Sequence, residues 1–223
     1  MTEPNTIVGL LIFVPAIIVL YFPLGEFERY FKANKALFMI LVGLGIGMGI
    51  GFFSLYFPLD NIITALLIVA LIEIVKFLVM MQKPFRLKYD APFYGFAFGA
   101  GIAAMMVFTL IYGIGLFSTE PTNLVFVFLF SYNYTFVNSA TGGIIGEGSR
   151  IGEFWNYLTR AFLLAALHGS IITFSWTLIG RDRIIGAFGL LFLGAIYGSI
   201  LVFFVYNNIF EGAIEEKIQE IED

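Results

Sequence analysis

The stretch IITALLIVALIEIVKFLVMM, residues 62–81, contains two ionisable side chains, Glu73 and Lys76, and is otherwise almost entirely apolar. A helix needs about 20 residues of this kind to cross the roughly 30 Å hydrocarbon core of a bilayer. The runs are too long for barrel strands, and backbone groups that face lipid must be paired within a helix. The sequence therefore predicts an all-α fold, a polytopic transmembrane helical bundle. The other predicted spans are 7–23, 36–58, 93–117, 157–179 and 184–204.

The composition excludes a water-soluble fold. Of 223 residues, 60% are hydrophobic and 13% are charged, whereas soluble domains have roughly 45–50% apolar and about 25% charged residues. We expect one membrane-embedded domain over residues 1–223 that ends in an acidic tail at 205–223. The chain has no basic face for nucleic acid, no cysteine and one histidine, so we expect no nucleic-acid partner, no metal site and no cofactor.

Residues 118–156 contain no apolar run of the length that a span needs. Within 123–146, the apolar part is too short to span and is followed by polar residues that include Asn133 and Asn138. We therefore predict that 118–156 is a non-spanning or re-entrant insert. This gives six spans, with seven as the alternative.

Orientation follows from the Lys and Arg residues of the short loops. Because the first and third loops are basic and the second has no Lys or Arg, we predict a multi-pass protein of the cell membrane with its N-terminus outside. With six spans, Arg181 and Arg183 would lie inside and the acidic tail outside. With seven, this pair would lie outside and Arg150 inside. The basic loop residues are Arg29, Lys32, Lys35, Lys83, Arg86 and Lys88.

Glycines recur at the spacing that brings transmembrane helices into close contact. We interpret them as packing positions and assign them no chemistry. They are Gly43, Gly47, Gly51, Gly95, Gly99, Gly194 and Gly198.

Glu73, Lys76 and His168 are ionisable residues within predicted spans. Each costs on the order of 2.5–3.5 kcal/mol to insert at mid-membrane depth, so each is a candidate functional residue. Glu73 and Lys76 share a helix face at i,i+3, where they could form a self-neutralising ion pair, with Lys76 reaching toward the third loop. Alternatively, Glu73 could hold a water and take its proton. His168 could be hydrogen-bonded by Ser170, Thr173 or a neighbouring span, or it could meet Glu73 in one site.

The stretches Glu73-Ile-Val-Lys76 and Arg160-Ala-Phe-Leu-Leu-Ala-Ala-Leu-His168 resemble motifs of PrsW-type intramembrane proteases, which form a superfamily with the CAAX prenyl proteases and the Aph-type subunit of γ-secretase. The resemblance covers most of the chain outside 118–154 and the tail. It rests on Glu73-Ile-Val-Lys76, Tyr89-Asp90, Tyr94-Gly95, Gly99, Gly101-Ile-Ala-Ala104 and Arg160-Ala-Phe-Leu-Leu-Ala-Ala-Leu-His168.

The resemblance implies a catalytic role for Glu73 as the carboxylate that activates water, with Lys76 in the place of the family's lysine and His168 assisting. The chain also departs from the family's pattern. Ile72 replaces the first Glu of the Glu-Glu-x-x-Lys motif, Met106 and Val107 replace a Glu-Asn pair, and Tyr197 replaces a histidine.

Two functional hypotheses follow. In the first, the chain is a PrsW-like, glutamic-type endopeptidase that cuts single-span membrane proteins, with activity reduced by the lost groups. General acid–base help is worth typically 10²–10⁴-fold per group. In the second, it is a non-catalytic scaffold of the same superfamily that binds partner transmembrane helices in the lipid bilayer. The sequence leaves its status as an enzyme uncertain.

Overall fold

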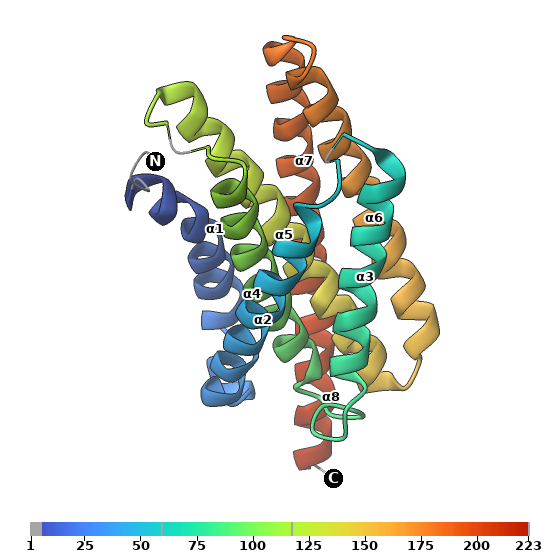
Figure 1. Cartoon of the computed structure of the whole chain (residues 1–223). Helices are drawn as coiled ribbons and strands as arrows, with labels where there is room; N and C mark the ends of the chain where they lie inside the picture. The colour runs from blue at the N-terminus through green and yellow to red at the C-terminus, as the bar shows by residue number, and fades with distance from the viewer. Residues whose placement is uncertain (1–5, 59, 117, 223) are drawn as a thin grey trace.

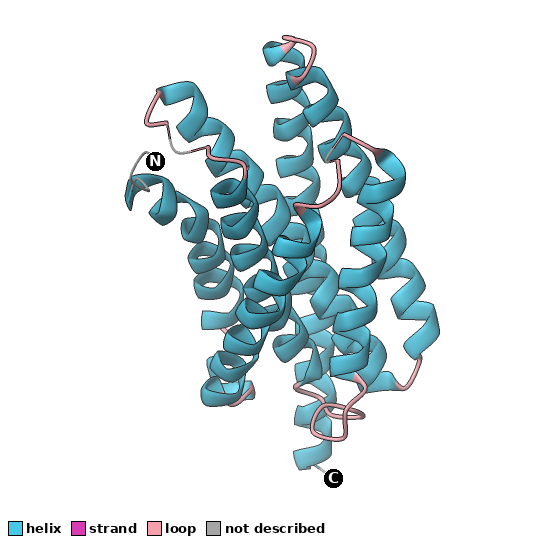
Figure 2. Cartoon of the chain, in the orientation of Figure 1, coloured by secondary structure: helices cyan, strands magenta, loops and turns pink. Residues whose placement is uncertain are grey.

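The computed structural model describes residues 6–58, 60–116 and 118–222, which form helices joined by short loops (Figures 1 and 2). These described ranges contain no strand, so the prediction of an all-α fold is confirmed. Helices α1 to α7 run alternately along one bundle (Figure 1). Their bounds are α1 Thr6–Gly25, α2 Ala33–Ser54, α3 Ile62–Met80, α4 Ala91–Gly113, α5 Pro121–Ile151, α6 Phe154–Ile179 and α7 Ile184–Phe204. The described ranges also contain three shorter elements, namely the 3-10 turn η1 Glu28–Tyr30, the π-helical turn η2 Val205–Phe210 and α8 Glu211–Glu222.

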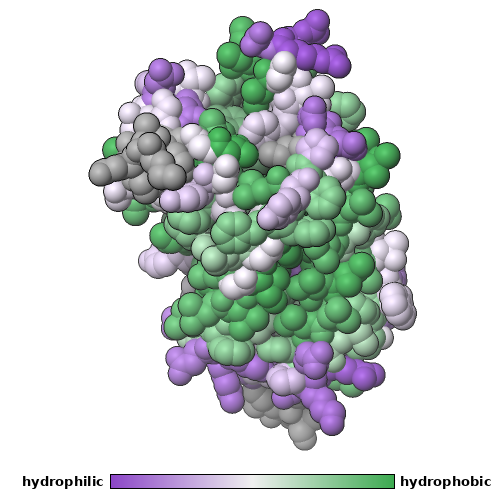
Figure 3. Space-filling view, viewed as in Figure 1, coloured by the Kyte–Doolittle hydropathy of each residue, from purple (hydrophilic) through white to green (hydrophobic). Residues whose placement is uncertain are grey.

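Within the residues that the structure describes, six helices are long and apolar enough to cross a membrane. They are α1, α2, α3, α4, α6 and the continuous helix Ile184–Glu215, which contains α7 and η2. Figure 3 shows hydrophobic side chains over the middle of one face, with hydrophilic side chains gathered toward its two ends. This distribution suits a multi-pass membrane protein. The segment predicted as a tail, 205–223, begins as a helical continuation of α7.

Helix α5 differs from the insert expected at 118–156. It is one unbroken helix of 31 residues, which corresponds to about 46 Å at 1.5 Å per residue. It runs from the end of the bundle where α1 begins to the end where α8 lies (Figure 1). The described chain therefore makes no re-entrant turn here, and the α6–α7 loop with Arg181 and Arg183 lies at the opposite end from the α3–α4 loop.

The two central helices of the bundle are α4 and α5. Most of α4 is buried, and it packs against α1, α2 and α5. Helix α5 is buried over most of its length from Phe126 to Ser149, and it also contacts α1, α3, α6 and α7. The polar residues of α5 therefore lie inside the protein, where an unpaired hydrogen-bonding group is costly. This position explains why a helix with modest hydropathy can occupy the core.

Glycines let the backbones of the central helices approach one another closely. A methyl group at Gly47 of α2 would collide with the backbone of Ile102 on α4, and one at Gly99 of α4 would collide with the backbone of Asn138 on α5. Gly194 of α7 likewise faces α5, against the side chain of Asn133. These contacts confirm the interpretation of the glycines as packing positions.

The two sides of α2 provide a matched test of this packing. We expect Gly47→Ala to destabilise the protein by about 1–3 kcal/mol, because the added methyl overpacks a backbone contact. Gly49 lies two residues away, is exposed and has open space around it, so Gly49→Ala should leave stability nearly unchanged. The midpoints of thermal or denaturant unfolding in detergent would measure both. Equal effects of the two substitutions would contradict the assigned α2–α4 contact.

Candidate functional site

The Lys76 side chain reaches from α3 into the protein interior. It is completely buried, and Glu73, one helical turn earlier, is 1% exposed. The Lys76 Nζ atom lies 2.7 Å from Glu73 Oε1, so the two residues form a buried ion pair. The ion pair considered from the sequence is therefore present, but Lys76 does not reach toward the third loop, as that interpretation also expected. The ammonium instead points toward α5.

Helix α5 supplies the remaining acceptors for this ammonium group. Lys76 Nζ donates to Asn138 Oδ1 at 2.8 Å and to Thr141 Oγ1 at 2.7 Å. Thr141 in turn donates to Glu73 Oε1 at 3.1 Å, and Asn138 donates through its Nδ2 to the carbonyl of Tyr134. A lysine ammonium has three donors, and here each has an acceptor. We call Glu73, Lys76, Asn138 and Thr141 the polar cluster.

One oxygen of the polar cluster lacks a partner. Glu73 Oε2 is buried, and no hydrogen bond to it is found within the described residues. A carboxylate oxygen has lone pairs that could accept a hydrogen bond from water. The cluster thus pairs two charges of α3, links them to α5 through hydrogen bonds, and retains one acceptor for a small polar molecule.

His168 lies on α6 and is 3% exposed. Its Nε2 atom is 3.3 Å from Asn133 Oδ1 on α5, and its ring meets the edge of the Tyr134 ring at a centroid distance of 5.6 Å. Asn133 is itself fixed by two donated bonds, to the carbonyls of Leu129 and Leu191. The histidine is therefore satisfied by a neighbouring helix, as one of the sequence-based alternatives proposed, and not by Ser170 or Thr173.

The three predicted site residues all contact α5, but at different places. Glu73 and Lys76 meet Asn138 and Thr141, whereas His168 meets Asn133 and Tyr134. In the described part of the chain, no hydrogen bond joins Glu73 to His168. Neither residue lines any of five prominent cavities of the described structure. The expected shared cavity between Glu73 and His168 remains a prediction.

The positions at which the chain departs from the PrsW pattern are apolar or are satisfied locally. Ile72, Met106 and Val107 are buried hydrophobic side chains. The hydroxyl of Tyr197 donates to the carbonyl of Leu164 at 3.0 Å. None of these groups adds a titratable side chain to the polar cluster. Over the described ranges, no group of three or more His, Cys, Asp or Glu residues could hold a metal ion.

Sequence reasoning missed Asn133, Asn138 and Thr141 as functional partners. Polar residues in 123–146 were interpreted as evidence against a span, although a buried Glu–Lys pair requires acceptors and donors from another helix. Asn138 and Thr141 have the i,i+3 spacing of one helix face. That spacing, in the only segment rich in amides and hydroxyls, was the signal available in the sequence.

Comparison with family models, with curated proteins and with solved structures gives no match to this chain.

The polar cluster predicts an asymmetry between single and double substitutions. Lys76→Met leaves the Glu73 carboxylate buried without its counter-ion, so we expect a loss of about 3–5 kcal/mol in stability. The double variant Glu73→Leu/Lys76→Met removes both charges, and it should be far less destabilised than the single variant. Unfolding midpoints of the purified variants in one detergent would show the difference. A single variant as stable as wild type would mean that the pair does not hold α3 in place.

Proposed function

We propose that the chain is a non-catalytic multi-pass membrane scaffold that binds partner transmembrane helices, with the polar cluster as an internal structural element. Two glycines on the outer side of α2 carry this proposal. Gly45 and Gly49 are exposed, and a side-chain carbon at either position would meet nothing within 4 Å. A Gly-x-x-x-Gly pair in an apolar helix is a common surface for close contact with another transmembrane helix.

Helix α2 carries two sets of glycines, one on each of two faces. Gly43, Gly47 and Gly51 face α4 within the bundle. Gly45 and Gly49 are not needed for that contact, so they are available to a helix from outside. A helix of a single-span membrane protein fits the chemistry of this surface, because its backbone could approach α2 as closely as α4 does.

The geometry of Glu73 supports a structural role. A general base must reach water and the reacting group within hydrogen-bond distance. Glu73 is 1% exposed, and its Oε1 atom accepts bonds from both Lys76 and Thr141. The candidate assistant His168 is held by Asn133 instead. These contacts stabilise the fold without preparing a site for peptide hydrolysis.

Helix association should depend on the outer glycines. We expect Gly45→Leu/Gly49→Leu to fold normally and to lose association with a single-span model peptide that carries its own Gly-x-x-x-Gly sequence. Energy transfer between labelled protein and labelled peptide in vesicles would measure this. Gly189→Leu is a matched control, since Gly189 on α7 is also exposed with open space around it. If the control weakens association as much as the α2 variant, the outer glycines do not form the binding surface.

A second candidate function is the PrsW-like glutamic-type endopeptidase. The observation that favours it is the buried Glu73 Oε2 atom, which has no hydrogen-bond partner in the described structure. This oxygen could bind a water and take its proton, while Lys76 keeps the carboxylate in place. The substrate would be a single-span membrane protein.

Glu73→Gln separates the two functions, because the amide keeps the size of the carboxylate but cannot act as a base. For a scaffold, neither wild type nor Glu73→Gln should cleave any single-span model substrate, and both should bind the model peptide. For a peptidase, wild type should cleave and Glu73→Gln should lose about 10²-fold or more of that activity while remaining folded. Cleavage can be followed by mass spectrometry of products. Specific cleavage that Glu73→Gln abolishes would refute the scaffold proposal.

We further propose that α5 is a seventh span and that the N-terminus lies outside. Nine basic residues lie at the end of the bundle formed by the α1–α2, α3–α4 and α5–α6 loops and α8, whereas Arg181 and Arg183 lie at the other end (Figure 1). Basic residues of short loops favour the cytoplasmic side. The residues at the basic end are Arg29, Lys32, Lys35, Lys83, Arg86, Lys88, Arg150, Arg160 and Lys217.

The absence of cysteine from the sequence makes this topology directly testable. Single Ser118→Cys and Arg183→Cys variants should react with a membrane-impermeant thiol reagent added outside intact cells. Glu153→Cys and Lys83→Cys variants should react only after permeabilisation. Labelling of positions 118 and 153 from the same side would exclude a seventh span and restore the six-span arrangement.

A further inference from the structure

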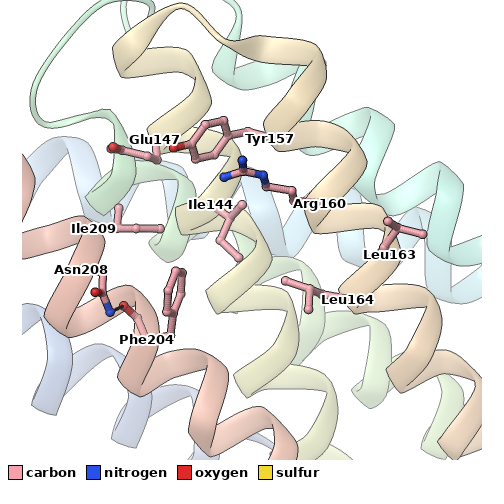
Figure 4. A pocket seen from close by; sticks show the side chains of 9 residues that line it. All are labelled: Ile144, Glu147, Tyr157, Arg160, Leu163, Leu164, Phe204, Asn208 and Ile209. Atoms are coloured by element: carbon pink, nitrogen blue, oxygen red, sulfur yellow. Dashed lines mark hydrogen bonds between the residues drawn. The ribbon is translucent and has the colours of Figure 1, made fainter.

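A cavity of about 410 Å³ lies between α6 and the α7–η2 helix, with α5 as its floor (Figure 4). The buried side chains of Ile144 and Ile209 form its inner wall. Leu163 and Phe204 line its outer edge and are 61% and 48% exposed. Because these exposed side chains are apolar, the cavity opens sideways toward the surroundings of the bundle, where the lipid chains would lie.

Glu147, Tyr157 and Arg160 lie near one end of the cavity, whereas the amide of Asn208 lies beside Phe204 on the opposite wall (Figure 4). Tyr157 and Arg160 precede Leu163 and Leu164 along α6, so polarity decreases with distance from the α5–α6 loop (Figure 4). This loop belongs to the end of the bundle where most Lys and Arg residues lie. In a bilayer, this polar end would lie at the depth of the lipid headgroups and the apolar part at the depth of the acyl chains.

Arg160 is a positively charged residue at the polar end of the cavity, and no described carboxylate forms an ion pair with it. Its guanidinium group lies 5.0 Å from the centre of the Tyr157 ring, and Figure 4 shows it directed from α6 into the gap. Within the described residues it has no hydrogen bond and no ion pair. Glu147, the acidic residue of the cavity, is already engaged, because both its oxygens accept 2.7 Å bonds from Arg150.

Two further polar side chains around the cavity have hydrogen-bond partners within the protein. Asn208 donates to the carbonyl of Phe204, and the exposed Glu153 on the adjacent loop accepts a bond from Asn156. Asn208 and Ile209 lie in the π-helical turn η2. Turns of this type are rare and frequently mark functional sites. Here η2 supplies part of the wall opposite Arg160.

We propose that this cavity binds one phospholipid, with an acyl chain against Ile144, Leu163 and Ile209 and the phosphate on Arg160. A guanidinium group presents paired N–H donors that match phosphate oxygens. Basic pockets between transmembrane helices on the cytoplasmic side are known sites for lipid headgroups. The combination of an unpaired guanidinium and an apolar interior selects an amphiphile that carries both a phosphate and a chain.

Native mass spectrometry of the full-length protein in detergent would test this proposal. The probes are phosphatidylglycerol, a diacylglycerol with the same acyl chains, and inorganic phosphate. We expect one tightly held copy of phosphatidylglycerol and at least about tenfold weaker binding of diacylglycerol, since the charge-assisted bonds are lost. Inorganic phosphate should not displace the lipid.

Two pairs of variants make the test specific. Arg160→Gln should weaken phosphatidylglycerol binding by about tenfold or more, whereas Arg86→Gln should not. Arg86 is a matched control because it lies at the same end and also stacks on an aromatic ring, that of Phe154 at 5.2 Å. Leu163→Trp should fill the cavity and reduce lipid binding. Leu167 is 54% exposed and lies outside the cavity. Leu167→Trp should therefore leave lipid binding unchanged.

Three results would overturn the proposal. These are unchanged lipid binding by Arg160→Gln, equal binding of diacylglycerol and phosphatidylglycerol, and displacement of the lipid by inorganic phosphate. The first two would mean that the guanidinium does not recognise the headgroup. The third would mean that the acyl chain contributes nothing and that the site is one for a free anion.

Discussion

A buried ammonium group must be surrounded by acceptors, and Lys76 imposes that requirement on the helices around it. Its acceptors come from its own helix through Glu73 and from α5 through Asn138 and Thr141. This fixes the rotation of α3 relative to α5, because any other rotation would leave a charge unpaired in an apolar interior. Direct packing between these two helices is sparse, since α3 packs mainly along α6. Between α3 and α5, the hydrogen bonds of the polar cluster therefore fix the relative position of the helices, as close packing does between other helices of the bundle.

The other half of the bundle is held by a different kind of contact. Where α2 meets α4 and α4 meets α5, glycines allow backbone to approach backbone. Inside lipid, the hydrophobic effect gives little preference for one helix pairing over another, so close packing and interhelical hydrogen bonds determine the arrangement. The protein uses packing on the α2–α4–α5 side and hydrogen bonds on the α3–α5–α6 side. Helix α5 takes part in both, which explains its mixture of Gly, Ser, Thr and Asn.

Sequence reasoning could locate the six apolar helices and the packing glycines because each has a local signature. A run of apolar residues identifies a span whatever surrounds it, and glycine spacing identifies a contact face. It could also find Glu73, Lys76 and His168, since ionisable groups are conspicuous in apolar helices. The role of 118–156 could not be found in this way. Hydropathy evaluates each residue as if its side chain faced lipid. Asn138 and Thr141 instead face the ammonium group of Lys76. Whether a side chain faces lipid or another side chain is decided only by the folded arrangement.

The position of α5 has a consequence for how the chain is made. A helix with this many amides and hydroxyls gains little from lipid when it is alone, so in a seven-span arrangement its entry into the membrane depends on helices already present. Its partners Lys76, Glu73 and the carbonyl of Ile12, which accepts a bond from Ser131, all precede it in the sequence. They leave the ribosome first. His168 and Leu191, which engage Asn133, come later. The order of the helices along the chain thus provides α5 with part of its polar environment during synthesis, and the helices that follow complete it.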